Sequence, residues 1–179
     1  MRRRSLLTAA LAGAGATVTG VGLSSPASAA IAYGADVKRS VTIERAKDWW
    51  DRNIPYNDGA YTWDVNKGRK YRQDCSGFVA MCWKMNGDDP DGSYGIFTGN
   101  LDQYSHRIDW NDLLPGDALL LKNEHVKLFE KWANPATKAD FWIYEEGRPA
   151  TDMNHYSINV VELRQAGYVP MRYDHIIKG

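Results

Sequence analysis

The stretch that decides the fold is residues 114–132, which read LPGDALLLKNEHVKLFEKW. Its first four residues, Leu-Pro-Gly-Asp, have the composition of a tight turn. Residues 118–121 then form a continuous apolar run, and residues 125–132 form a second run with strand character. Lys, Asn and Glu at 122–124 separate the two runs. The stretch therefore predicts two successive β-strands joined by a short turn.

Further strands are predicted on the C-terminal side, at residues 141–145, 156–163 and 169–173. The predicted helices precede this run of strands. This order predicts an α+β fold, with N-terminal helices packed on an antiparallel sheet of about five strands.

The first predicted helix begins near Ile43, with Ser40 or Thr42 as its N-cap. Five apolar residues recur at helical spacing and predict one buried face: Ile43, Ala46, Trp49, Trp50 and Ile54. Residues 55–73 are polar and without a clear period, so they predict a long loop.

The second predicted helix spans residues 75–85, with Asp74 as its N-cap and an apolar stripe that includes Phe78 and Cys82. Residues 87–99 are rich in Asp, Pro and Gly, and they end it. A short helix is predicted at 100–106, with Leu101 and Tyr104 turned inward.

Residues 1–29 have the features of an export signal. Three arginines at 2–4 precede a stretch of apolar and small residues, and Ala27-Ser28-Ala29 offers a signal-peptidase cleavage site. The paired arginines fit a twin-arginine signal, although a general secretory signal begins the same way. The alternative is an uncleaved N-terminal anchor. We expect a secreted or cell-wall-associated protein with no stable membrane anchor, whose single domain spans residues 30–179.

The charge balance argues against nucleic acid as a partner. Removal of residues 1–29 takes away three of the 22 basic residues and none of the 22 acidic ones, which leaves a net charge of −3. No long run of one sign of charge occurs in the sequence. We expect a monomer.

Two cysteines are present, and their spacing argues against a disulfide. Cys75 and Cys82 are seven residues apart, which is about 10.5 Å along a helix, whereas a disulfide needs Cα atoms within about 7 Å. Both are therefore expected to be free thiols, with Cys82 in the core.

Cys75 is the candidate nucleophile. It begins a predicted helix, where unpaired amides and the helix dipole stabilise a thiolate and lower the pKa of a cysteine. The small residues after it, Ser76 and Gly77, leave room for a substrate. The alternative is an inert core cysteine at a helix start, which is the commoner case.

A thiol nucleophile needs a base, and His125 is the best placed because it opens a strand directly after a turn. His106, His155 and His175 remain alternatives. A third polar group should orient the imidazole, and Glu145 on the next predicted strand could reach it. The rivals of Glu145 are its sequence neighbours, Tyr144 and Glu146.

A metal site is not expected. Cys75, His125 and His155 could form a ligand set, but the sequence has no short ligand pair such as Cys-x-x-Cys. No cofactor is expected either.

The chain resembles the NlpC-type cell-wall cysteine peptidases, which belong to the papain-like fold class. Three motifs carry the resemblance, in the family's order: Asp-Cys-Ser-Gly-Phe-Val at 74–79, Leu-Pro-Gly-Asp at 114–117 and His-Val at 125–126. Together they are fairly specific, and the resemblance covers roughly residues 41–147.

The resemblance implies roles for six residues. Cys75 would attack an amide carbonyl, His125 would be the base, and Glu145 would take the third catalytic place. Tyr56 matches an active-site tyrosine that precedes the nucleophile helix, and Asp74 and Ser76 flank the nucleophile where relatives contact the peptide.

The chain also departs from this family. A long polar insert replaces the usual Trp-Gly-Gly-like turn, Lys127 stands where a small residue is usual, and Glu is unusual in the third place. The resemblance implies hydrolysis of amide bonds in peptidoglycan stem peptides, such as a D-glutamyl bond to a diamino acid. The alternatives are an amidase or acyltransferase of the same fold, and a catalytically inactive wall-binding module.

Overall fold

The computed structural model describes residues 32–86 and 95–179. The predicted export signal at 1–29 lies outside the described residues, as does most of the predicted loop at 87–99. No helix within the described ranges is long and apolar enough to cross a lipid bilayer.

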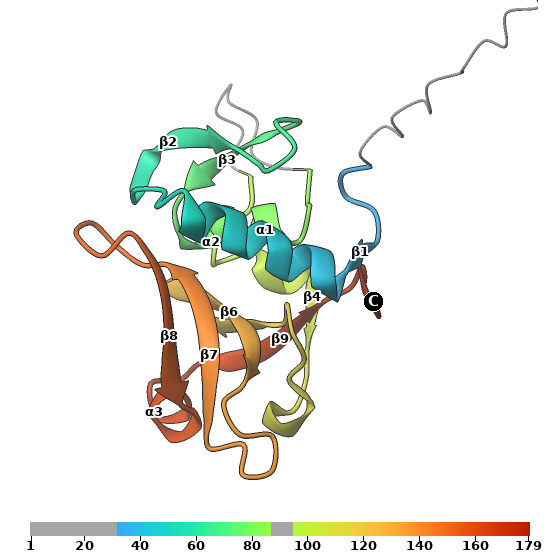
Figure 1. Ribbon diagram of the computed structural model, residues 1–179, viewed down its shortest axis with the longest axis vertical. Coiled ribbons are helices and arrows are strands. Elements are labelled where there is room, and N and C mark those ends of the chain that lie inside the picture. Colours follow the sequence, from blue (N-terminus) through green and yellow to red (C-terminus); the bar gives the residue numbers. More distant parts are fainter. Residues whose placement is uncertain (1–31, 87–94) are drawn as a thin grey trace, which may run out of the picture. The chain divides into compact units, whose positions relative to one another are not determined.

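The described residues form an α+β fold with three α-helices, as the order of elements predicts (Figure 1). The helices are α1 (Arg39–Asp51), α2 (Cys75–Cys82) and α3 (Val160–Gln165). The strands are β1 (Val37–Lys38), β2 (Asn57–Trp63), β3 (Lys70–Gln73), β4 (Ser105–Arg107), β5 (Ala118–Leu121), β6 (His125–Trp132), β7 (Asp140–Glu146), β8 (Met153–Asn159), β9 (Val169–Tyr173) and β10 (Ile176–Ile177).

The main sheet is antiparallel and has six strands, in the order β4-β9-β5-β6-β7-β8, rather than about five. A separate hairpin pairs β2 with β3, and the short β1 pairs in parallel with β10. Strands β5, β6 and β9 lie where the sequence predicts them.

Two predictions about the strands are wrong. Residues 55–73, expected to be a loop, contain the β2–β3 hairpin. Much of β2 is exposed, so its polar residues do not show the alternation of apolar and polar residues that predicts a strand. The strand expected at 156–163 ends at Asn159. There the Asn159 side chain accepts a hydrogen bond from the amide of Val161 at 2.8 Å and begins α3.

The helix predictions hold in part. Helix α1 begins at Arg39, four residues before the predicted start, and neither Ser40 nor Thr42 caps it. Trp50, expected to face inward, is 39% exposed. At 100–106, Leu101 is buried as expected, but only 101–103 is helical, as a 3₁₀ turn, and Tyr104 is exposed.

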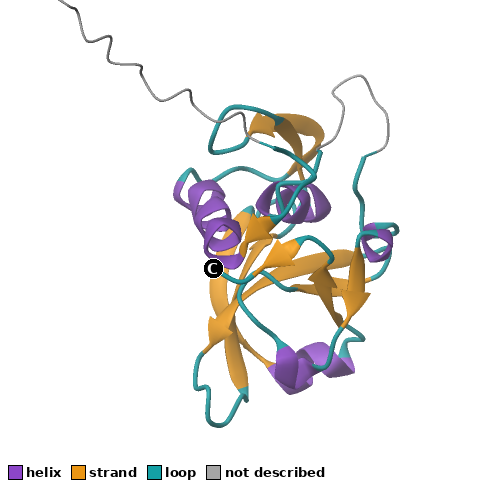
Figure 2. Ribbon diagram, turned by 90° about the vertical axis from the view of Figure 1, so that its right-hand side faces the viewer, coloured by secondary structure: helices purple, strands orange, loops and turns teal. Residues whose placement is uncertain are grey.

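The core consists of two clusters of buried side chains. The larger cluster joins α1 and α2 to one face of the sheet through residues such as Trp49, Phe78 and Val126. The smaller joins α3 to the other face, through residues that include Leu163 and Phe129. Figure 2 shows α1 and α2 on one side of the strands and α3 on the opposite side. Cys82 lies in the larger cluster, and both cysteines are free thiols, as predicted.

The pairing of β6 with β7 contains an irregularity that sets which residues oppose each other. Phe129 pairs with Ile143, but Lys131 pairs with Trp142, so that Glu130 is an extra residue on β6. On the N-terminal side of this bulge, Leu128 pairs with Tyr144. Continuing the same register by one residue places Lys127 opposite Glu145.

The turn before β5 is held by one buried carboxylate. Asp117 accepts hydrogen bonds from Arg39 at 2.9 Å and from Arg172 at 2.7 and 3.0 Å, and its side chain also caps the amide of Leu114 at 2.9 Å. It thereby ties α1 and β9 to the start of the β5–β6 hairpin. Gly116 precedes it with a φ of 87°, a conformation that favours glycine.

We predict that Asp117→Ala lowers the free energy of unfolding by about 3 kcal/mol, because it leaves two arginines and an amide without their common acceptor. Urea denaturation checks this. Asp109→Ala, at an exposed position where the side chain caps nothing, is the control and should change stability by less than about 0.5 kcal/mol. Equal effects of the two substitutions would contradict the prediction.

Candidate active site

Cys75 is the first residue of α2, and the residues around it fix that helix end. The Asp74 carboxylate accepts a hydrogen bond from the amide of Gly77 at 2.7 Å, which confirms Asp74 as the N-cap. Arg72 on β3 binds the same carboxylate at 2.6 Å. A Cβ atom at position 77 would lie only 2.1 Å from the carbonyl oxygen of Arg72. Glycine at this position therefore permits the close approach of α2 to β3.

The thiol of Cys75 does not have the expected low pKa. Cys75 is only 7% exposed. Burial, followed by the negative charge of Asp74, raises its pKa to about 12, against the opposing effect of hydrogen bonds from the amides of Val126 and Ser76. The prediction of a pKa lowered by the helix start is therefore wrong for the protein without substrate, because loss of hydration outweighs the helix-end amides. The contact with the Val126 amide also places the sulfur beside the start of β6.

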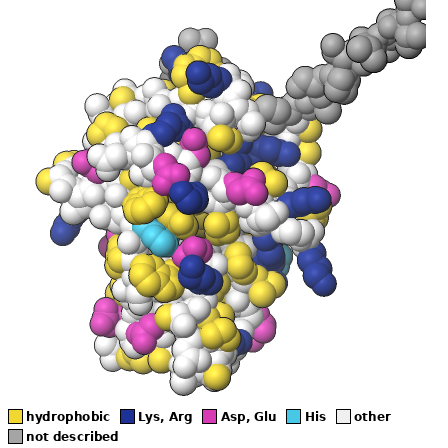
Figure 3. Space-filling model, viewed as in Figure 1, with side chains coloured by type: hydrophobic (Ala, Val, Ile, Leu, Met, Phe, Trp, Pro, Cys, Tyr) yellow, Lys and Arg dark blue, Asp and Glu magenta, His cyan; other side chains and the backbone are white. Residues whose placement is uncertain are grey.

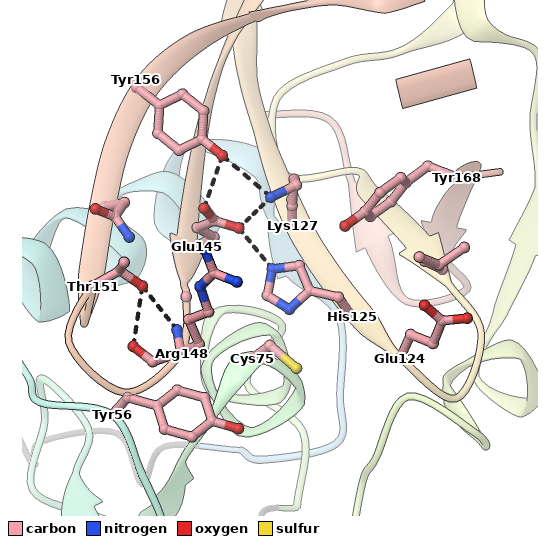
Figure 4. Close-up of a pocket in the computed structure, with 13 residues that line it drawn as sticks. Tyr56, Cys75, Glu124, His125, Lys127, Glu145, Arg148, Thr151, Tyr156 and Tyr168 are labelled. Atoms are coloured by element: carbon pink, nitrogen blue, oxygen red, sulfur yellow. Dashed lines mark hydrogen bonds and ion pairs between the residues drawn. The ribbon is translucent and has the colours of Figure 1, made fainter. Parts of the chain in front are cut away.

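His125 lies beside Cys75 and is oriented by Glu145 (Figure 4). Its Nε2 atom is 2.6 Å from Oε2 of Glu145. The other ring nitrogen, Nδ1, is turned to the side of the ring on which Cys75 lies. The structure thus brings together the three residues that sequence reasoning nominated as nucleophile, base and orienting group.

Glu145 is itself part of a buried network. Its Oε2 atom also binds the ammonium of Lys127, and its Oε1 atom accepts a hydrogen bond from the Tyr156 hydroxyl at 2.8 Å. Burial alone would raise the pKa of Glu145, but the hydrogen bond from His125 and the charge of Lys127 outweigh it and hold the pKa at about 2. Glu145 is therefore ionised at any pH at which the protein would work.

These side chains line a cavity of about 670 Å³, and Tyr56, the residue before β2, also lines it (Figure 4). The backbone amide of Tyr56 is held by the Asp152 carboxylate at 2.9 Å. Two exposed side chains of opposite charge, Glu124 before β6 and Arg148 after β7, also line it. A cavity of this size admits a small peptide.

Asp74 and Ser76 are not among the described residues that line the cavity. Both side chains are buried and bind Arg72, and the Ser76 hydroxyl also donates to Asp74 at 3.2 Å. Their geometry shows a role in building the start of α2, and contact of either with a substrate stays a prediction.

The rivals of His125 are engaged elsewhere. His106 pairs with Asp174, His155 with Glu130 and His175 with Asp36. None of the three is among the described residues that line the cavity with Cys75.

The rivals of Glu145 face the other side of the sheet, as strand alternation requires. Tyr144 stacks on the ring of His155 at 4.1 Å. Glu146 is completely buried, and neither of its carboxylate oxygens has a hydrogen-bond partner among the described residues. Burial, with the nearby charges of Asp152 and Asp74, raises the pKa of Glu146 to about 8.

Sequence reasoning missed two members of the network, Lys127 and Tyr156. Lys127 could have been found, because it lies two residues after His125 on one strand and so shares its face. Tyr156 could not, because its contact with Glu145 depends on the register between β7 and β8, which places Tyr156 opposite Ile143. Within residues 32–86 and 95–179, no three His, Cys, Asp or Glu side chains form a group that could hold a metal ion.

On the face shown in Figure 3, basic and acidic side chains are interspersed with apolar ones. This face therefore has no large patch of a single charge.

Comparisons with protein-family models, with curated proteins and with solved structures gave no match to this chain.

We predict that Glu146→Gln stabilises the protein increasingly as the pH rises from 5 to 8. The carboxyl stays protonated in the folded protein up to about pH 8 but ionises near pH 4.5 when unfolded, so the native protein loses stability across this window. The free energy of unfolding of the wild type should fall relative to that of the variant by at most about 1.4 kcal/mol per pH unit. Urea denaturation of both proteins at several pH values measures it. Glu162→Gln, at an exposed position, is the control. A difference in stability between wild type and Glu146→Gln that does not change with pH would contradict the raised pKa of Glu146.

Proposed function

We propose that this protein is a secreted cysteine hydrolase of the papain-like class that cleaves amide bonds in peptidoglycan stem peptides. The observation that carries the proposal is the placement of His125, with one ring nitrogen held by Glu145 and the other turned toward Cys75 at the floor of the cavity. A nucleophile, a base and an orienting carboxylate in this order are the arrangement that acyl transfer requires.

In the proposed reaction, the sulfur of Cys75 attacks the amide carbonyl carbon while its proton passes to Nδ1 of His125. The tetrahedral intermediate then expels the amine, which takes the proton from His125, and a thioester remains on Cys75. A water molecule, deprotonated by His125, hydrolyses the thioester and restores the thiol.

The high pKa of Cys75 determines how the first step occurs. A thiol with a pKa of about 12 is protonated in the free protein, so no thiolate stands ready before the substrate arrives. The proton must leave as the carbon–sulfur bond forms, and this makes His125 indispensable as a general base.

The start of α2 offers donors for the negative charge that develops on the carbonyl oxygen. The amides of Gly77 and Phe78 are satisfied by the side chain and the carbonyl of Asp74. The amides of Cys75 and Ser76 precede them, and the Ser76 amide already stabilises negative charge on the sulfur. Backbone amides so placed can bind an oxyanion.

The substrate assignment rests on the cavity and on the sequence. The opposite charges of Arg148 and Glu124 on the cavity wall suit a peptide that carries both a carboxylate and an ammonium group. The export signal expected at residues 1–29 would deliver the protein to the cell wall, where stem peptides have both groups. An amidase or acyltransferase acting on another amide is the alternative within the same chemistry.

The buried, high-pKa thiol favours a second candidate, a wall-binding module without catalytic activity. Such a module would bind stem peptides through the same cavity but release no product. The two candidates differ in a single measurable property, the appearance of cleaved peptides.

We predict that Cys75→Ala abolishes hydrolysis and leaves the melting temperature within a few degrees of wild type, because Cys75 borders the cavity and its truncation creates no new enclosed void. Cys82→Ala is the matched control in the same helix. It should retain activity but cost about 1–2 kcal/mol of stability, since Cys82 is wholly buried in the core.

The measurement is mass spectrometry of purified cell-wall fragments digested with the wild type and with each variant. Cleaved stem peptides from the wild type and from Cys82→Ala, but not from Cys75→Ala, would support the proposal. Absence of products from the wild type, with retained binding of the fragments, would favour the inactive module instead.

A further inference from the structure

Lys127 is a buried cation directly behind the candidate base. Lys127 is 7% exposed. Its ammonium binds Oε2 of Glu145 and lies 3.2 Å from the Tyr156 hydroxyl. The same ammonium lies over the rings of Tyr156 and Tyr168, at 5.8 and 5.7 Å from their centroids. A buried lysine with this many fixed contacts is held in one place (Figure 4).

His125 and Lys127 share one acceptor atom. Nε2 of His125 lies 2.6 Å from Oε2 of Glu145, and the Lys127 ammonium binds that same oxygen. The charge of Glu145 is therefore already balanced by Lys127 before the imidazole gains a proton. An imidazolium formed at His125 would have to share the carboxylate with a second cation.

We propose that Lys127 is a positioning residue that sets the pH range in which His125 acts as a base, by neutralising the carboxylate that orients the imidazole. The inference rests on the proposed function of this site and assigns to it a fourth participant. Glu145 can then hold the ring in place without holding a proton on it.

The stability of the imidazolium depends on the charges beside it. A lone buried carboxylate beside a histidine favours the protonated ring, whereas a nearby cation disfavours it. The Lys127–Glu145 pair has no net charge, so it orients the ring with little bias toward the protonated form. His125 consequently remains available as a base at lower pH than it would be beside Glu145 alone.

The other groups that face the ring do not replace this pair. Cys75 on α2 is an uncharged thiol, and Tyr156 and Tyr168 are uncharged because their pKa values are raised, chiefly by burial. Glu124 and Arg148 line the same cavity but are exposed, so that solvent screens their charges.

The experiment is the pH dependence of kcat/KM for wild type and Lys127→Met, together with NMR titration of the His125 ring in the same proteins without substrate. Both the acidic limb of the rate profile and the NMR midpoint should move to higher pH by about one unit in Lys127→Met. Lys127→Arg, which keeps the charge, should leave both near the wild-type positions.

Two further variants make the test specific. Lys127→Met combined with Glu145→Gln removes both charges and should return the NMR midpoint toward wild type. Lys131→Gln removes a cation from an exposed position on the same strand and should move neither quantity. Lys127→Gln serves in place of Lys127→Met if the methionine variant does not fold.

An unmoved midpoint in Lys127→Met, with a lower rate at every pH, would overturn the inference, because Lys127 would then act only on structure. Failure of both uncharged variants to fold would overturn it for the same reason. If the wild type hydrolyses no amide, the proposed function fails, whereas the NMR midpoint still decides the role of Lys127.

Discussion

The contact between His125 and Glu145 is the interaction on which the rest of the site depends. It joins the first residue of β6 to the penultimate residue of the neighbouring strand β7, and it leaves the other ring nitrogen free of this contact. Without it, the thiol of Cys75 would lie at the end of a buried helix with no oriented imidazole beside it. The site thus consists of one 2.6 Å contact between β6 and β7 and of the Cys75 sulfur at the start of α2.

Desolvation favours the neutral form of both acidic groups of the site, but their pKa values end on opposite sides of their ordinary values. Cys75 and Glu145 are both largely removed from water, yet the thiol has its pKa raised to about 12 and the carboxyl has its pKa held at about 2. The difference lies in their partners: the carboxylate has an imidazole, an ammonium and a hydroxyl, whereas the thiol has two amides and a neighbouring negative charge. Burial costs ionisation only where compensation is incomplete.

Two of the three departures from the resembled family, Lys127 and Glu145, are neighbours in space. A glutamate in the third place and a lysine two residues after the histidine are each unusual alone, but Glu145 and Lys127 bind one another. Each compensates the charge of the other, so that the pair can replace a neutral orienting residue. The two unusual residues of the sequence are thus partners in the structure.

Much of this arrangement follows from local chemistry that the sequence contains. Asp74 caps a helix that begins at Cys75, the turn at 114–117 precedes β5 and β6, and the seven-residue spacing of the cysteines excludes a disulfide, because each depends on residues close together in the chain. The choice of Glu145 over Tyr144 and Glu146 was decided only in three dimensions. It depends on the extra residue at Glu130, since a register shift of one exchanges the two faces of a strand. The burial that raises the pKa of Cys75 is likewise a property of the packed sheet and helix, which no local pattern in the sequence contains.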